Sequence, residues 1–490
     1  MSRTAIRIVP NIAFATLALT AAAPLAARLA AQTPAVATQP SLGPAPRLVV
    51  PAVEKSRLAN GLSIEVVPMH EVPLVQASLL VRGGARLDAS RPGLATFTAN
   101  MLDEGAGARD AFQLAAEVAY LGATLNTGAS WDAISVDVGA PKRTFAQAMA
   151  LAADVMLRPT FAATDIKRQR DLRLASILQQ RDQPGAVANL VFNGMVFPAG
   201  HPYHAPINGD SAATVSLDSA GVRDFWRRAA DPRRATLVVT GDVTLAEVRA
   251  LAQRLFGAWK APANPLPLAG TPAEPPRPAT HIVLVNKPGA AQSVVAIGAP
   301  GVTRRSPDYP AIMLMNTILG GSFSSRLNDI LREQKGYTYG AGSGFGWRPV
   351  PGPFTASAQV RTNVTDSSLA IFFQEFRRIR DSGVTAAELE RARAYLVLGS
   401  LGDFETTGQV AGELAGLTIL GLPLTTIPAD LAAIQRLTAA DVQRAARTYL
   451  DPEHYTVVIV GDIANIRAGI DRLGIGPVEV RDYNGNEVGS

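Results

Sequence analysis

The stretch Asp231–Asp242, DPRRATLVVTGD, occurs again later in the chain, without a gap, as Asp451–Asp462, DPEHYTVVIVGD. In both copies an Asp-Pro turn precedes an apolar run typical of a buried strand, and a Gly-Asp turn follows it. The shared register extends upstream into a helical pattern, where Leu217 corresponds to Leu437. This repeat predicts two homologous halves rather than a chance match of one turn.

The beginnings of the two halves also correspond, although more loosely. The apolar stretch Leu74–Val81 precedes a helical pattern around Gly93–Leu102, and the stretch Ser293–Ile297 precedes another at Pro307–Leu319. Strands grouped with flanking helices favour an α+β fold over an alternating parallel one. We therefore expect two homologous domains, each a mainly antiparallel sheet flanked by helices.

A Pro-rich segment between the two repeats marks the boundary between these domains. Residues 260–280 have neither a helical nor a strand period, which is typical of an extended linker. We accordingly assign residues 50–259 to the first domain and residues 281–475 to the second. Residues 476–490 are left as a tail.

The N-terminus has the features of a secretory signal peptide. Arg3 and Arg7 precede an apolar run from Ile8 to about Ala27, and small residues follow. We assign residues 1–37 to this signal and the start of a flexible leader. An uncleaved anchor is the alternative, but a Pro and an Asn interrupt the run. The expected location is outside the inner membrane, in the periplasm if the source is Gram-negative, with no membrane attachment after cleavage.

Composition excludes several classes of function. The 490 residues include no Cys, which excludes disulfides, thiolate metal ligands and a Cys nucleophile. The formal net charge of +5 is small and dispersed, and no RNA-binding motif accompanies it. We therefore expect no nucleic acid partner.

Three groups of motifs resemble the pitrilysin/insulinase (inverzincin) superfamily of zinc peptidases. The first is NGL at Asn60–Leu62 with VRGGAR at Val81–Arg86, and the second is HPY at His201–Tyr203. The third is GGSFSSRL at Gly320–Leu327, followed by LREQKGYTY at Leu331–Tyr339. The resemblance covers most of residues 55–475, and its third group is the most specific.

In active members of the family, an H-x-x-E-H helix motif and a later Glu build the zinc site. Two His residues at i and i+4 lie on one helical face, and the Glu between them acts on the metal-bound water. Here the corresponding residues, called the four zinc positions below, are Thr96, Ala99, Asn100 and Ser176. Neutral oxygens and a methyl group cannot replace these ligands and this base. The resemblance thus implies no cofactor in this chain, with zinc in a partner subunit.

No shift of the alignment restores a zinc motif. The five His residues, none of which forms the motif or its reverse, are His70, His201, His204, His281 and His454. A metal held by His201 and His204 is conceivable, but the intervening Pro favours a structural turn. Asp103 and Glu104 are interpreted as solvated charges at a helix end, with metal binding as the alternative.

The second half retains a pair of residues that the resemblance associates with catalysis. In the family, an Arg and a Tyr seven residues apart reach another domain's zinc site, where they hold the peptide and stabilise the oxyanion. Arg332 and Tyr339 have this spacing. The structural alternative is a helix cap and a packed strand residue. Tyr337, on the same face as Tyr339 if the segment is extended, could replace it. Gly320 and Gly321 permit close backbone approach, with substrate contact also possible.

The resemblance therefore implies a non-catalytic subunit of a heterodimeric zinc metalloendopeptidase. Its partner would be an H-x-x-E-H subunit of the same family, and its substrates short or unfolded peptides bound in extended form. One alternative is an inert peptide-binding or scaffold protein of the same fold. Another is an independent hydrolase with a different mechanism, although the chain has no G-x-S-x-G motif.

Overall fold

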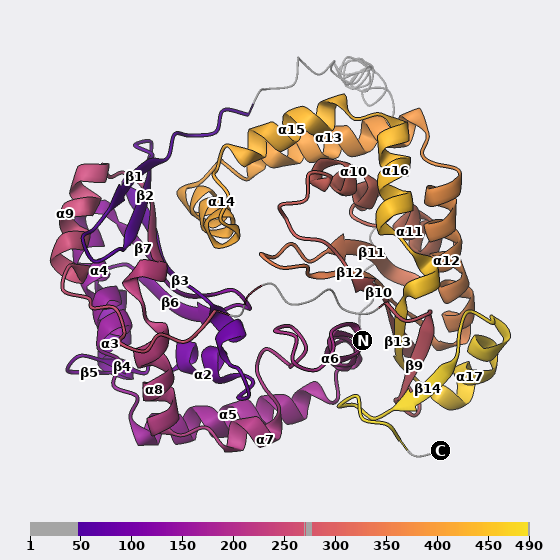
Figure 1. Ribbon diagram of the computed structural model, residues 1–490, viewed down its shortest axis with the longest axis horizontal. Helices are drawn as coiled ribbons and strands as arrows, with labels where there is room; N and C mark the ends of the chain where they lie inside the picture. The colour runs from indigo at the N-terminus through magenta and orange to yellow at the C-terminus, as the bar shows by residue number, and fades with distance from the viewer. Residues whose placement is uncertain (1–47, 269, 271–276, 489–490) are drawn as a thin grey trace, which may run out of the picture. The chain divides into compact units, whose positions relative to one another are not determined.

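The computed structural model describes residues 48–268, 270 and 277–488 (Figure 1). The predicted signal peptide, residues 1–37, lies outside these ranges. None of the helices within them combines the length and the apolar character needed to cross a membrane.

The first half forms a six-stranded sheet. Its strands, in spatial order, are β1 (Glu54–Arg57), β2 (Ser63–Pro68), β8 (Ala235–Gly241), β3 (Leu74–Arg82), β7 (Ala133–Pro141) and β6 (Thr124–Ala129). All neighbours are antiparallel except β2 and β8. Strands β1 and β2 pair antiparallel as a hairpin whose turn includes Asn60 and Gly61, and Gly61 has a φ of 98°.

Helices connect the strands of the first half, and some of them cover its sheet. They are α2 (Leu94–Asn100), α3 (Ala111–Tyr120), α4 (Lys142–Leu157), α5 (Ala163–Gln180), α6 (Pro184–Val196), α7 (Ser211–Val215), α8 (Ser219–Ala229) and α9 (Leu245–Phe256). Short elements complete this half: the 3-10 helices η1 (Gly84–Leu87) and η2 (Pro232–Arg234) and the small hairpin of β4 (Gly105–Ala106) and β5 (Arg109–Asp110).

The second half repeats this plan. The strand order is β11 (Thr338–Phe345), β12 (Pro353–Arg361), β10 (Gln292–Pro300), β13 (Thr456–Gly461), β9 (His281–Asn286) and β14 (Val478–Arg481). The repeated strands β8 and β13 have equivalent neighbours. Strand β8 pairs parallel with β2 and antiparallel with β3, and β13 pairs parallel with β9 and antiparallel with β10. The α+β fold and the internal repeat are thereby confirmed. Residues 476–490, assigned to a tail, contribute β14 to the sheet edge.

Helices also connect and flank the strands of the second half. They are α10 (Tyr309–Leu319), α11 (Arg326–Asn328), the π-helix η3 (Asp329–Gln334), η4 (Thr362–Val364), α12 (Thr365–Asp381), α13 (Ala386–Gly402), α14 (Thr407–Leu420), α15 (Thr426–Arg436), α16 (Ala439–Tyr449), η5 (Pro452–His454) and α17 (Ile463–Arg472).

Each half lends one helix to the sheet of the other. Helix α14 packs on β3 and β8, with Leu414 buried against Leu80 and Val238. The Thr240 hydroxyl in β8 donates a hydrogen bond of 2.7 Å to the carbonyl of Thr407. Figure 1 shows α14 lying against the first sheet.

Helix α6 makes the reciprocal contact with the second sheet. Val191 and Phe192 of α6 are buried in one cluster with Ala296 and Val458 of β10 and β13. Because their own helices cover the other face, β8 and β13 are buried on both sides, and such strands are apolar at nearly every position. The continuous apolar runs of the sequence repeat are the consequence.

The segment after α9 has no helix or strand in its described parts, residues 260–268, 270 and 277–280. Arginines of the first half hold its backbone. Arg228 Nε donates to the carbonyl of Asn264 at 3.2 Å, and Arg234 Nη1 donates to that of Leu266 at 2.6 Å. The first part of the linker is therefore attached to the first domain.

Candidate functional site

The four zinc positions lie on α2 and α5. Thr96 is buried, and its hydroxyl lies within hydrogen-bond distance of the carbonyl oxygens of Gly93 (3.1 Å) and Ile207 (3.0 Å). Ala99 is part of the first hydrophobic core, whereas Asn100 and Ser176 are exposed. Across the described ranges, no group of three His, Cys, Asp or Glu side chains is arranged to hold a metal ion.

A buried guanidinium occupies the space between these two helices. Arg173, one turn before Ser176 on α5, places Nη1 2.9 Å from the Gly93 carbonyl, 3.2 Å from Thr96 Oγ1 and 3.3 Å from the Asn208 carbonyl. Burial lowers the pKa of Arg173 to about 10, so it remains charged at neutral pH. A fixed positive charge bonded to Thr96 opposes a divalent cation nearby.

Sequence reasoning missed Arg173. The available signal was its position, because residues at i and i+3 of a helix share a face, and Arg173 and Ser176 are so related. An Arg on the face expected to carry a zinc ligand indicates that the metal charge has been replaced.

The start of α2 is organised by a second buried charge. Asp88 accepts hydrogen bonds from the backbone N–H groups of Gly93 (2.8 Å) and Ala95 (2.7 Å). Burial raises the pKa of Asp88 to about 7, although these bonds and the charge of Arg173 act in the opposite direction. Asp88 and Arg173 thus satisfy backbone groups at the start of α2 from within the chain.

The HPY motif forms the structural turn that the sequence predicts. The ring of His201 stacks on Phe197 at a centroid distance of 4.5 Å, and burial lowers the pKa of His201 to about 4. His204 places Nδ1 2.7 Å from the carbonyl of Phe197 and closes the turn through its N–H to the carbonyl of His201. The two imidazoles are held by packing and by backbone contacts.

The VRGGAR and HPY motifs meet in a buried polar network. The Tyr203 hydroxyl donates to Asp132 Oδ1 at 3.0 Å, and Arg86 Nη1 lies 3.3 Å from the same oxygen. Arg348, from the β11–β12 connection of the second half, lies over the Tyr203 ring at 4.2 Å. This buried network thus contacts the second half through Arg348.

The interpretation of Asp103 and Glu104 as solvated charges is wrong. Both are partly buried, and Glu104 accepts hydrogen bonds from Arg168 and Gln169 of α5. Burial raises the pKa of Asp103. The sequence could not show this because α5 is distant in the chain.

The predicted Arg and Tyr lie at the edge of the second sheet. Arg332, on the π-helix η3, places its guanidinium carbon 4.5 Å from the ring centre of Phe323 and Nη1 3.5 Å from Glu333 Oε1. Tyr339, on edge strand β11, is 92% exposed. The β11–β12 register shifts by one residue between Thr338 and Ala341, so Tyr339 lies in a β-bulge.

The expectation that Tyr337 and Tyr339 share a strand face is wrong. Tyr337 precedes β11 and packs, partly buried, against the second core, where Arg361 lies 6.0 Å from its ring centre. The bulge and the late start of the strand break the alternation on which the expectation depended. Of the two, Tyr339 is the accessible phenol.

Gly320 and Gly321 make the close backbone approach that was expected. A Cβ on Gly320 would lie 2.4 Å from the backbone nitrogen of Ser343 in β11, which donates to the Gly320 carbonyl at 3.0 Å. A Cβ on Gly321 would lie 2.7 Å from Asn316 Nδ2. Contact of these glycines with substrate remains a prediction.

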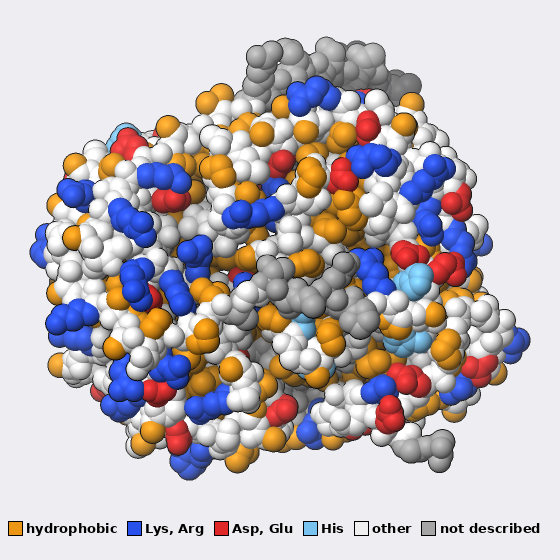
Figure 2. All heavy atoms as spheres, viewed as in Figure 1, with side chains coloured by type: hydrophobic (Ala, Val, Ile, Leu, Met, Phe, Trp, Pro, Cys, Tyr) orange, Lys and Arg blue, Asp and Glu red, His pale blue; other side chains and the backbone are white. Residues whose placement is uncertain are grey.

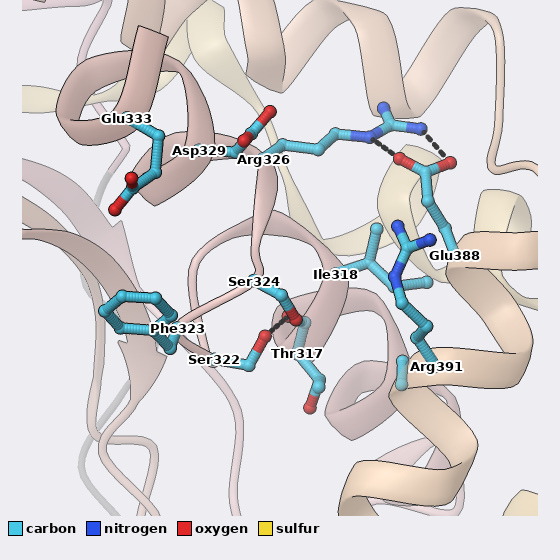
Figure 3. Close-up of a pocket in the computed structure, with 11 residues that line it drawn as sticks. Thr317, Ile318, Ser322, Phe323, Ser324, Arg326, Asp329, Glu333, Glu388 and Arg391 are labelled. Atoms are coloured by element: carbon cyan, nitrogen blue, oxygen red, sulfur yellow. Dashed lines mark hydrogen bonds and ion pairs between the residues drawn. The ribbon is translucent and has the colours of Figure 1, made fainter. Parts of the chain in front are cut away.

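A cavity of about 360 Å³ lies behind the same loop, which includes Phe323 and Ser324 (Figure 3). Arg326 forms a bidentate ion pair with Glu388 of α13, with Nε–Oε1 at 2.6 Å and Nη2–Oε2 at 2.9 Å. Burial opposes ionisation of Glu388, but hydrogen bonds from Arg326 and Thr385 outweigh it and lower its pKa to about 2. The pair fixes the loop that precedes Arg332.

Both halves of the chain match models of one protein family. Residues 66–195 match the model described as insulinase (peptidase family M16), and residues 216–396 match the model described as peptidase M16 inactive domain. The chain belongs to the M16 family. Its two halves are therefore M16-like domains of mixed α/β structure.

Relatives extend along nearly the whole length of this M16 chain. It is 24% identical over 435 residues to a mitochondrial-processing peptidase subunit beta of Lentinula edodes, covering 85% of this chain and 91% of that one. An uncharacterized zinc protease of Mycobacterium leprae is 23% identical over 418 residues, covering 84% and 92%.

A crystal structure of a peptidase M16 inactive domain from Pseudomonas fluorescens has the same fold. It superposes with a TM-score of 0.78 at 27% identity, covering 84% of this chain and 98% of that chain. This M16 chain thus has the inactive-domain fold, while the four zinc positions lack the groups that a zinc protease requires.

Proposed function

We propose that this chain is the non-catalytic subunit of a heterodimeric zinc metalloendopeptidase and supplies Arg332 and Tyr339 to the zinc site of its partner. The observation that carries the proposal is the 92% exposure of Tyr339 on a bulged edge strand. The partner is an H-x-x-E-H subunit of the same family, and it holds the zinc.

The placement of Tyr339 suits a group that acts on another molecule. An exposed phenol can donate its hydroxyl to the carbonyl oxygen of a bound peptide, where negative charge develops during hydrolysis. β-Bulges redirect side chains and are frequent beside active sites. In this chain the bulge separates the environment of Tyr339 from that of Tyr337, which packs inward.

The placement of Arg332 supports the same role. Stacking on Phe323 restrains the side chain without using all the donors of the planar guanidinium. Those donors match a pair of peptide carbonyl oxygens. The Arg326–Glu388 pair fixes the loop immediately upstream, so that the Arg332 side chain starts from a rigid base.

Short or unfolded peptides in extended form are the proposed substrates. Strands β6 and β11 stand at the edges of the two sheets, and an edge strand presents unpaired backbone groups to an added strand. We place the mature complex outside the inner membrane, in the periplasm if the source is Gram-negative, on the basis of the N-terminal sequence pattern.

The test is peptide hydrolysis by the complex purified natively through a tag on this chain, compared with the recombinant chain supplied with zinc. We expect chelator-sensitive activity in the complex and none in the lone chain. Tyr339→Phe should lower kcat roughly a hundredfold, as loss of one oxyanion donor does. Arg332→Ala should raise KM as well, because it holds the peptide.

Matched controls are two exposed residues of the first half, Tyr120→Phe and Arg227→Ala, which should leave turnover unchanged. If Tyr339→Phe and Arg332→Ala have no more effect than these controls, the assignment is wrong. A native complex without any peptidase would instead support the alternative, an inert peptide-binding or scaffold protein of this fold.

A further inference from the structure

A second cavity, of about 990 Å³, lies among α10, α13, α14 and α15 of the second half. These four helices lie together in Figure 1, and in Figure 2 hydrophobic side chains are visible between charged ones over the helices at the top of the view. The role proposed above for Arg332 and Tyr339 makes no use of this cavity. Its volume is that of a ligand site rather than of a packing defect.

One end of the cavity holds a charged pair that is already satisfied. The guanidinium of Arg304, only 8% exposed, stacks on Tyr309 with its carbon 3.2 Å from the ring centre. It also forms an ion pair with Asp430 of α15. The charge of Asp430 is therefore compensated from within the protein.

Glu413 of α14 lines the same cavity without such compensation. It is partly buried, and among the described residues no hydrogen bond or ion pair reaches its carboxylate, although Arg304 exerts a more distant attraction. Burial, and then the neighbouring Asp403, raise the pKa of Glu413. A half-buried carboxylate beside another acid is stabilised by any cation that enters.

The acidic side chains Glu413 and Asp403 have no ion-pair partner among the described residues that line the cavity. Arg391 is the other basic lining residue, but it lies toward Glu388, at the part that this cavity shares with the cavity of Figure 3. Glu413 and Asp403 thus face the remaining space with no basic residue of their own. Charge complementarity therefore favours a cationic occupant over an anionic one.

Apolar side chains form another part of the cavity wall. Met313, Ile427 and Leu431 line its interior, and Tyr395 and Leu398 of α13 are 55% and 45% exposed. An aromatic face beside carboxylates suits a cationic head group, and the aliphatic walls suit its stem and an apolar neighbour.

We propose that this cavity binds a basic amphipathic peptide segment, with a Lys or Arg side chain directed at Glu413 and an adjacent apolar side chain against Tyr395 and Leu398. The site is separate from Arg332 and Tyr339, and its occupation does not depend on proteolysis.

The test is fluorescence anisotropy of the purified chain with a labelled peptide in which arginine alternates with leucine. A second peptide has citrulline in place of arginine and so keeps the shape but loses the charge. We expect the arginine peptide to bind at least roughly tenfold more tightly, as charge-assisted hydrogen bonds require. Glu413→Gln should remove this difference, whereas Glu405→Gln, an exposed acid outside the cavity, should preserve it.

A second variant fills the cavity instead of changing its charge. Gly399 lines it, and a Cβ there meets no atom within 4 Å, so Gly399→Trp projects into open space. It should weaken the arginine peptide at least roughly tenfold. Gly185→Trp on α6, equally unobstructed, is the control.

Equal binding of the two peptides, or full binding to Glu413→Gln and Gly399→Trp, overturns the proposal. Arg332→Ala and Tyr339→Phe should preserve the difference in affinity between the two peptides, because that difference is assigned to Glu413. Failure of this inference is thereby distinguishable from failure of the proposed catalytic role.

Discussion

Replacing Glu388 with Gln removes the charge that anchors the loop carrying Phe323 and leading to Arg332. Glu388 is 15% exposed and accepts two hydrogen bonds from Arg326, at 2.6 and 2.9 Å, as well as the N–H of Thr385 at 2.8 Å. A Gln side chain preserves the shape and one carbonyl acceptor, but it leaves the Arg326 guanidinium buried without a counter-charge.

Two independent considerations give similar magnitudes for the loss. Lowering the pKa of Glu388 from 4.5 to about 2 corresponds to about 3 kcal/mol of stabilisation at neutral pH. Breaking a buried ion pair by removing one partner costs about 3–5 kcal/mol, because the other charge remains. We therefore expect Glu388→Gln to reduce the free energy of unfolding by about 3 kcal/mol.

The assay is urea unfolding at pH 7, followed by tryptophan fluorescence, with hydrogen–deuterium exchange over residues 322–334 as a local measure. Glu390→Gln, on the same helix, is the matched control. Glu390 is 67% exposed and paired with Arg393, so its loss should cost less than about 0.5 kcal/mol. If the two variants unfold at the same urea concentration, or exchange in the loop is unchanged, the anchoring role is refuted.

The dependence on pH gives a second check on the same pair. A carboxyl whose folded pKa is depressed contributes its full stabilisation above its ordinary pKa and loses it as pH falls through the folded value. The difference between wild type and Glu388→Gln should thus be complete above about pH 4.5 and shrink toward zero near pH 2. A difference that stays constant across this window contradicts the assignment.

Three further predictions concern the packing of the halves and the four zinc positions. Leu414→Ala should lower the free energy of unfolding, measured in urea, by about 2–5 kcal/mol, because Leu414 is 1% exposed where α14 packs on the first sheet. Leu398→Ala is the control and should lower it by less than about 1 kcal/mol, because that side chain is half exposed. Tyr203→Phe should lower the free energy of unfolding by about 1–3 kcal/mol in the same measurement, because it removes a hydrogen-bond donor from the buried carboxylate of Asp132. An unchanged urea midpoint would show that this hydrogen bond does not stabilise the fold. A variant with His at 96, Glu at 99, His at 100 and Glu at 176 should bind zinc weakly in a chelator competition, because Arg173 remains. Adding Arg173→Leu should raise the zinc affinity at least roughly tenfold. Equal zinc affinities of the two variants would show that Arg173 does not oppose the metal.

Much of the fold could be predicted from the sequence because its signals are local. The Asp-Pro and Gly-Asp turns around β8 and β13, and the helical spacing of α3 and α4, depend on residues close together in the chain. The family motifs located the four zinc positions and the Arg–Tyr pair for the same reason.

Contacts between distant segments could not be predicted in this way. The exchange of α6 and α14 between the halves joins segments far apart in sequence. The only local indication was the unbroken apolar character of β8 and β13, which is typical of strands with helices packed on both faces of their sheet. The bulge at Tyr339 is likewise a property of the pairing of β11 with β12, not of the residues in β11 alone. Arg173 became significant only once its contacts with Gly93, Thr96 and Asn208 were visible.

The two candidate regions of the chain differ in a way that bears on function. Around the four zinc positions, the buried charges are bonded from within the chain: Arg173 bonds Thr96, and Asp88 bonds the start of α2. The cost of burying these two charges is therefore offset without a ligand. Tyr339 has the opposite character, since its phenol makes almost no contact with its own chain and gains little from the fold. A side chain that contributes so little to stability is free to bind another molecule. Arg332, which stacks on Phe323, likewise leaves guanidinium donors available. This difference between the four zinc positions and Tyr339 supports the role that we propose for Tyr339 at the zinc site of a partner.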